Sequence, residues 1–170
     1  SVTVKVAMMQ LVDAVKLQGA TVKADAFTSQ RSDQIVFTLP AEATDGEVML
    51  LLKSGVEVPA GSIQTVVPTN LSAAPSPVKN GAVLTISGND LDLITSVAFT
   101  AAEGTVEAEI SSKSASELKV TVPETAQSGN VTLSLANGKT VAVACVIKVA
   151  TITALSPESL MAGEQLVIRG

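Results

Sequence analysis

The most constraining feature of this 170-residue chain is a repeat with a period of about 80 residues. One set of turn and apolar residues returns after 82 positions: Pro75, Gly81, Leu84, Ile86 and Gly88 recur as Pro157, Gly163, Leu166, Ile168 and Gly170. A second set returns after 83 positions: Pro40, Gly46, Val48, Leu50, Leu52 and Gly55 recur as Pro123, Gly129, Val131, Leu133, Leu135 and Gly138. When turn-forming proline and glycine residues and apolar residues match at a constant offset, they predict tandem copies of one module.

The offsets divide the chain into three stretches. Residues 1–67 form a repeat that lacks its first strand, residues 68–149 form a complete repeat, and residues 150–170 form the opening strands of a third. The joints near Pro68 and Ala150 contain no Gly/Ser-rich linker. Short joints of this kind restrict motion between domains, so we expect an elongated, semi-rigid row.

The complete repeat shows alternation of apolar and polar residues, with no helical period. We expect about seven short strands, in the ranges 70–73, 83–87, 95–99, 106–110, 118–122, 131–135 and 141–149. Turn signals separate them at intervals typical of an immunoglobulin-like sandwich. The predicted fold class is all-β, with tandem immunoglobulin-like antiparallel β-sandwiches.

Two stretches resemble a known family. Residues 152–157 read I-T-A-L-S-P and residues 162–170 read A-G-E-Q-L-V-I-R-G, which resembles the opening of an IPT/TIG domain of the E-set type. The central repeat carries the same signature in the same order: Pro75, Gly81, Leu84, Ile86, Gly88 and Leu91. The later T-V-P and S-G-N-V-T-L segments are similar to the second half of that family's pattern.

Two segments of the central repeat are similar to repeats in Bacteroidetes cell-surface lipoproteins of polysaccharide-capture systems. They read G-N-D-L-D-L-I-T-S-V-A-F and S-A-S-E-L-K-V-T-V-P-E-T-A-Q-S-G. This resemblance implies a non-enzymatic spacer outside the cell, whose partners are neighbouring domains of a longer chain. It leaves two alternatives open. One is a module that binds carbohydrate or protein through its loops, and the other is an accessory part of a polysaccharide-degrading enzyme.

Composition narrows the functional classes further. The chain has no histidine, which excludes histidine-based catalysis and histidine metal sites. Aromatic residues make up only 2%, which argues against surfaces that stack on sugars or bases. The net charge of −5, without a basic cluster, argues against nucleic-acid binding. No apolar run approaches the roughly 18 residues of a membrane span. We therefore expect no enzyme, no cofactor and no membrane span in this segment.

Asn89, Asp90 and Asp92 lie close together after the second expected strand of the central repeat. Oxygen ligands at this spacing suit calcium, but no glycine-centred loop or distal glutamate follows them. Asn and Asp also favour tight turns, because they hydrogen-bond their own backbone. The first repeat carries no acid at the matching positions, so we predict a turn and no metal site.

Cys145 and a group of glutamates are the other candidates for chemistry. Cys145 occupies an inward position of an alternating strand, which predicts a buried, inert thiol. Glu103, Glu107 and Glu109 could resemble a pair of glycosidase carboxylates, which requires two acids across a cleft. A solvated outer face is the simpler interpretation, and no catalytic residue is predicted.

Two further predictions concern the ends of the repeats. Met8 and Met9 are expected to cap the end of the first core. The opening strands in residues 150–170 have no sandwich to complete, and an unpaired strand edge favours pairing with another chain. We therefore predict strand exchange, in which residues 150–170 dock onto the first repeat of a second copy.

Overall fold

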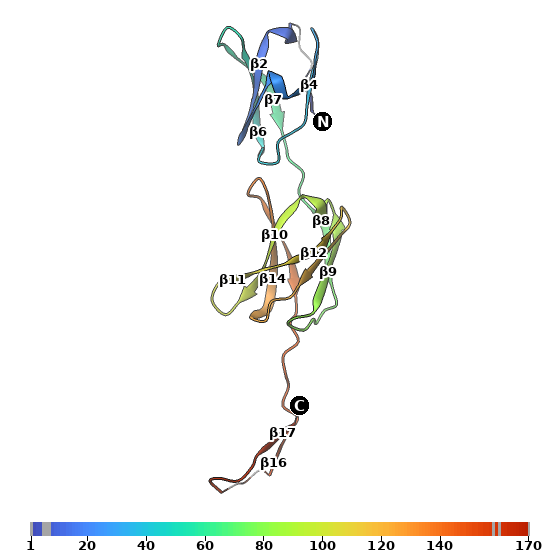
Figure 1. The fold of residues 1–170 in the computed structure, drawn as a ribbon, viewed down its shortest axis with the longest axis vertical. Helices are drawn as coiled ribbons and strands as arrows, with labels where there is room; N and C mark the ends of the chain where they lie inside the picture. The colour runs from blue at the N-terminus through green and yellow to red at the C-terminus, as the bar shows by residue number, and fades with distance from the viewer. Residues whose placement is uncertain (1, 5–7, 158, 160, 170) are drawn as a thin grey trace.

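The computed structural model spans residues 1–170 and describes all of them except 1, 5–7, 158, 160 and 170. The described residues form β-strands and three one-turn 3-10 helices, and every strand pair is antiparallel. Two sandwiches lie end to end along the long axis, and a hairpin continues the row beyond the second (Figure 1). The predicted all-β class with tandem immunoglobulin-like sandwiches is confirmed.

The second sandwich consists of two four-stranded sheets. One has the order β11-β10-β14-β15 and the other the order β12-β13-β9-β8. The bounds are β8 Thr69–Ala74, β9 Val83–Asn89, β10 Ile94–Ala101, β11 Thr105–Ala108, β12 Ile110–Lys113, β13 Glu117–Thr121, β14 Ala126–Leu135 and β15 Thr140–Cys145. The helix η3, Leu91–Leu93, connects β9 to β10. The connection passes from one sheet to the other, as a sandwich requires.

Aliphatic side chains fill the core of this sandwich, because the inward positions of both sheets alternate with polar ones. Leu84 and Ile86 on β9 lie opposite Val120 and Leu118 on β13, and all four are fully buried. Phe99, 1% exposed, supplies the aromatic volume. Burial of such side chains stabilises a fold by about 1.5–3 kcal/mol each.

The first sandwich repeats this plan with fewer strands. Its sheets have the orders β3-β2-β6-β7 and β1-β5-β4. The bounds are β1 Val2–Val4, β2 Val12–Leu17, β3 Ala20–Lys23, β4 Phe27–Gln30, β5 Ile35–Phe37, β6 Gly46–Leu52 and β7 Glu57–Ile63, with helices η1 Met9–Leu11 and η2 Ala24–Ala26. Its buried cluster shares no residue with that of the second sandwich. Val2 and Val4 pair with Phe37 and Ile35. This register matches that of β9 with β13, so the sequence repeat is also a repeat of strand pairing.

Two expected strands differ from the structure. The range 106–110 is divided at Glu109, because β11 pairs with β10 whereas β12 crosses over to pair with β13. The final strand, expected to reach residue 149, ends at Cys145. After Cys145 the backbone no longer pairs with β14. It pairs with Val78, whose amide donates a hydrogen bond to Val146 O at 2.9 Å. Val149 is consequently 71% exposed.

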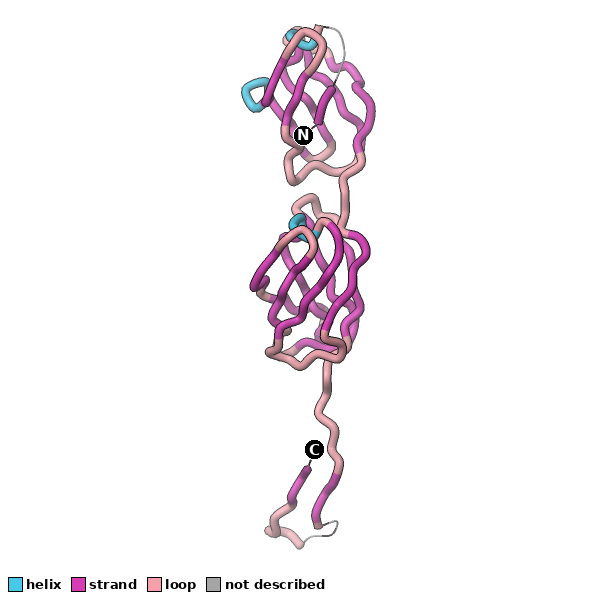
Figure 2. The backbone as a smooth tube through the Cα atoms, turned by 90° about the vertical axis from the view of Figure 1, so that its right-hand side faces the viewer, coloured by secondary structure: helices cyan, strands magenta, loops and turns pink. Residues whose placement is uncertain are grey.

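The C-terminal hairpin, β16 Ala154–Ser156 and β17 Val167–Arg169, extends away from the second sandwich (Figure 2). Its described residues are exposed. Strand exchange through residues 150–170 stays a prediction, as do the repeat boundaries at residues 67/68 and 149/150. None of the helices in the described part of the chain has the length and apolar character needed to cross a membrane.

Candidate functional site: the joint between the sandwiches

The densest group of polar contacts outside the strands lies where the two sandwiches meet. Strand β7 ends at Ile63, and β8 begins at Thr69. The lower end of the first sandwich, as drawn in Figure 1, presents Ala43, Asp45 and Thr65 to the second sandwich. The second sandwich contacts these residues through the hairpin that joins β14 to β15.

That hairpin supplies two donors, Asn137 and Lys139. Lys139 Nζ lies 2.8 Å and 2.7 Å from the two carboxylate oxygens of Asp45, and it also donates to Thr65 O at 3.3 Å. Asn137 Nδ2 donates to Ala43 O at 3.3 Å and lies 3.2 Å from Thr65 Oγ1. Side chains and backbone of both sandwiches therefore share one hydrogen-bonded network.

Asp45 is fixed from its own side as well. Its Oδ1 accepts hydrogen bonds from Thr65 N at 2.7 Å and from Thr65 Oγ1 at 2.8 Å. The hydrogen bond from Lys139, followed by those from Thr65, lowers the pKa of Asp45 from 3.8 to about 2. The side chains of Lys139 and Asp45 are 28% and 46% exposed, so solvent screens their attraction. The pair therefore contributes mainly to the relative orientation of the two sandwiches, because the Lys139 ammonium group donates to both carboxylate oxygens of Asp45.

A groove of about 470 Å³ lies beside this network and draws its walls from both sandwiches. Its apolar part includes Leu39, Pro40, Val66, Leu93 and Leu135. Lys113, on its rim, is already engaged, because its Nζ donates to Ile94 O at 2.8 Å. No aromatic ring is among the lining residues, so the groove offers no flat platform for a sugar.

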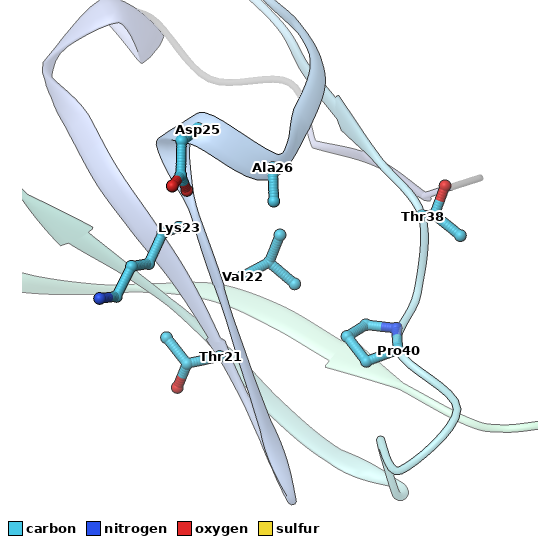
Figure 3. A pocket seen from close by; sticks show the side chains of 7 residues that line it. All are labelled: Thr21, Val22, Lys23, Asp25, Ala26, Thr38 and Pro40. Atoms are coloured by element: carbon cyan, nitrogen blue, oxygen red, sulfur yellow. The ribbon is translucent and has the colours of Figure 1, made fainter.

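A second hollow, of about 410 Å³, lies on the first sandwich (Figure 3). Val22, Ala26 and Pro40 face its centre, while Lys23 extends away from Pro40. Asp25 is the acid on its border. One lysine and one aspartate around an apolar floor do not form an acid–base pair poised for catalysis.

The predicted turn around Asn89, Asp90 and Asp92 lies close to the joint. Asn89 is the last residue of β9 and pairs with Thr69, while Asp92 belongs to η3 and lines the joint groove. Asp90 adopts the left-handed conformation, with φ of 58°. Nowhere in the described ranges do three or more Asp, Glu or Cys residues form a group suited to a metal ion.

The first sandwich shows that the turn at Asp90 does not require an acid. Met8 takes the matching position and the same left-handed conformation, with φ of 65°. In both copies the residue's carbonyl accepts the amide three positions on, from Leu93 at 3.3 Å and from Leu11 at 3.0 Å. A methionine and an aspartate thus make the same turn, and neither side chain makes a capping hydrogen bond, so the turn does not depend on the carboxylate of Asp90.

The other predicted positions are also accounted for. Cys145 is 3% exposed, and burial raises its pKa, which confirms the expected buried thiol. Glu103, Glu107 and Glu109 are all exposed on or beside the edge strand β11. Met9 is buried in the first core, as expected. The expectation for Met8 is wrong, because it is 65% exposed at the left-handed turn.

The contact between the two sandwiches was not predicted from the sequence, although a comparison of the two repeats contains a signal for it. Lys139 corresponds to Val56 in the first repeat, and Asp45 corresponds to Ser128 in the second. Each is a charge that appears in one copy only. The structure brings together these two departures from the repeat.

The architecture defines the class, a chain of tandem immunoglobulin-like sandwiches without a disulfide. The family model "IPT/TIG domain" matches residues 62–146, half of the chain, and covers the second sandwich. The chain belongs to the IPT/TIG family. A comparison with curated proteins finds no match.

Comparison with solved structures finds surface glycan-binding proteins. SGBP-B of a mixed-linkage glucan utilisation locus of Bacteroides ovatus is 20% identical, with a TM-score of 0.37 over 86% of this chain and 41% of that chain. PbSGBP-B of Prevotella bryantii is 16% identical, with a TM-score of 0.39 over 82% and 34%. SGBP-B of a complex xyloglucan utilisation locus of Bacteroides uniformis is 16% identical, with a TM-score of 0.37 over 84% and 43%. The matched part of this chain thus covers less than half of each of these proteins.

Proposed function

We propose that this chain is a non-enzymatic spacer of a bacterial cell-surface protein, in which tandem IPT/TIG sandwiches present another domain that captures glycans. The observation that carries this proposal is the end-to-end arrangement of the sandwiches, joined by Asp45, Thr65, Asn137 and Lys139 (Figure 1). A spacer must hold its two ends apart, and a bonded joint resists folding back. A short connection between residues 64 and 68 adds to that resistance.

The polar chemistry of the chain fits a structural role. Two described groups have clearly shifted pKa values, and both shifts have structural causes. Asp45 is lowered by the pairing that holds the joint, and Cys145 is raised by burial in the second core. Functional sites usually gather shifted groups in one cleft. Here one shift comes from the hydrogen bonds of the joint and the other from burial in a core, so the two do not share a cleft.

The extracellular location is part of the same proposal. It is supported by the resemblance of the repeats to those of Bacteroidetes surface lipoproteins. The cores need no covalent reinforcement, since the single cysteine is buried and free. Aliphatic packing of two separate clusters stabilises each sandwich, which suits a module used in series.

Two solution measurements test the proposal. Small-angle scattering is expected to give an elongated particle, with a maximum dimension that a compact 170-residue globule cannot reach. Isothermal titration with a mixed-linkage glucan heptasaccharide and with a xylogluco-oligosaccharide is expected to show no saturable heat. Saturable binding of either sugar would contradict the spacer proposal and favour a module that binds carbohydrate through its loops. A compact particle would contradict the extended arrangement that a spacer requires.

A further inference from the structure

Both sandwiches carry the same hairpin at their upper ends, built on one backbone conformation. Gly55 and Gly138 adopt φ of 85° and 79°. The amide of each glycine donates to the carbonyl three residues earlier, at 2.8 Å in the first sandwich and 3.0 Å in the second. The residue after each glycine closes the hairpin by accepting a backbone hydrogen bond, at 2.8 Å and 2.9 Å. The two hairpins therefore differ in side chains and not in shape.

Those side chains decide what each hairpin can bind. The first reads Ser54-Gly55-Val56, and the second reads Asn137-Gly138-Lys139. In the second hairpin, Asn137 and Lys139 make every contact with the first sandwich described above. A serine and a valine at those places could neither reach Ala43 O nor neutralise a carboxylate.

The lower ends of the sandwiches differ in a complementary way. Ser128 stands where the first sandwich has Asp45, and its hydroxyl is used internally, accepting from Ile147 N at 2.8 Å. Lys148 stands where the first sandwich has Thr65. The second sandwich thus carries a serine in place of the acid and a lysine in place of the threonine, so a lysine-bearing hairpin would find no carboxylate at the Ser128 position.

We propose that Ala43, Asp45 and Thr65 form a recognition surface for an immunoglobulin-like repeat whose last hairpin reads Asn-Gly-Lys. The surface rejects a repeat whose hairpin reads Ser-Gly-Val, because the carboxylate of Asp45 then faces a valine. The covalent chain sets the order of the repeats, and the side chains at the joint set whether neighbouring repeats dock and in what orientation. This inference goes beyond the spacer role, since the joint would be selective whatever domain the row presents.

The test exchanges the hairpin side chains within the full chain. The double variant N137S/K139V gives the second hairpin the side chains that the first already carries on the same backbone, so the hairpin is expected to fold. Residual dipolar couplings of backbone amides report whether the two sandwiches share one alignment tensor. The unmodified chain is expected to show one tensor, and N137S/K139V is expected to show two.

A second variant approaches the surface from the other side. D45S gives the first sandwich the residue that the second carries as Ser128, and it is expected to cause the same loss of a shared tensor. The matched control is K119V, because Lys119 pairs with Glu117 at 3.0 Å within the second sandwich, outside the joint network. It removes one lysine charge and is expected to leave one tensor.

The outcomes separate cleanly. Amide spectra of both sandwiches show first that each variant is folded. One shared tensor in both N137S/K139V and D45S, or two tensors in the unmodified chain, would overturn the recognition surface. Sugar binding by the unmodified chain would overturn the spacer function instead, and it would leave the alignment result unchanged.

Discussion

Lys139 of the second sandwich and Asp45 of the first, 94 residues apart in sequence, form a two-pronged ion pair with N–O distances of 2.8 Å and 2.7 Å. Both residues interrupt the repeat, since their counterparts are Val56 and Ser128. A repeat protein gains stability from each module and from each interface between neighbours. The modules here follow a shared pattern, whereas the interface depends on residues that are not repeated.

The first prediction concerns the pH dependence of this joint. The folded-state pKa of Asp45, about 2, lies below its ordinary value of 3.8. The contribution of a depressed carboxylate is fully present above the ordinary pKa and is lost as the pH falls through the folded one. We therefore expect coupling between the sandwiches to persist from neutral pH down to about pH 4, and to fade between about pH 4 and pH 2. Carbon-13 titration of the Asp45 carboxyl checks this.

The variant K139M tests the cause of that shift. Lys139 lowers the pKa of Asp45 more than any other group, so K139M is expected to raise it towards 3.8. The hydrogen bonds from Thr65 remain and keep it somewhat below that value. K119M, which removes a lysine outside the joint network, is the control. Titration of Asp45 near pH 2 in K139M would contradict the assignment.

The fold was largely predictable because alternation and turn residues act locally. The inward positions of Leu84 and Ile86 follow from alternation along the strand, and a one-residue slip in the pairing with β13 would expose them. The division of 106–110 was not predictable, because the alternation continues through Glu109 while the chain changes sheets. The end of β15 was missed for a similar reason: its apolar pattern continues, but Val78 supplies a new backbone partner.

The candidate site was harder to predict than the fold. Asp90 drew attention by its charge, yet Met8 makes the same turn in the other copy. Asp45 is an exposed and Lys139 a partly buried polar residue, both lie in loops, and neither lies in a recognisable motif. Their partnership depends on the packing of two whole domains, which no local pattern encodes.

A second prediction addresses the core of the second sandwich. Leu84 is fully buried among both sheets, so L84A removes apolar contacts and leaves a cavity. We expect a loss of about 2–5 kcal/mol in the free energy of unfolding. Urea unfolding followed by circular dichroism measures it, since the chain has no tryptophan. The neighbouring Val83 is 48% exposed, and V83A is expected to cost much less than L84A. Equal losses in the two variants would contradict the assigned inward face.

A third prediction separates backbone strain from steric collision at two glycines. Gly19 and Gly55 adopt nearly the same left-handed conformation, with φ of 83° and 85°. A Cβ at Gly55 meets nothing within 4 Å, so G55A is expected to cost only the left-handed strain, about 1–2 kcal/mol. A Cβ at Gly19 would lie 2.7 Å from Glu42 O, so G19A adds a collision with the backbone. We expect a clearly larger loss in chemical denaturation of G19A, and the reverse order would contradict the described loop.

The last prediction concerns the reactivity of Cys145. Its side chain is 3% exposed at the end of β15, and burial raises its pKa, so the nucleophilic thiolate is scarce in the folded state. We expect Ellman's reagent at pH 8 to react with the native chain far more slowly than with the urea-unfolded chain. A variant with a cysteine on the outer face of the same strand, A144C in a C145A background, supplies the matched control, because Ala144 is exposed. It should react at a rate close to that of the unfolded chain. Rapid labelling of native Cys145 would mean that β15 opens readily, and the sandwich would then lack the packed edge that the structure assigns to it.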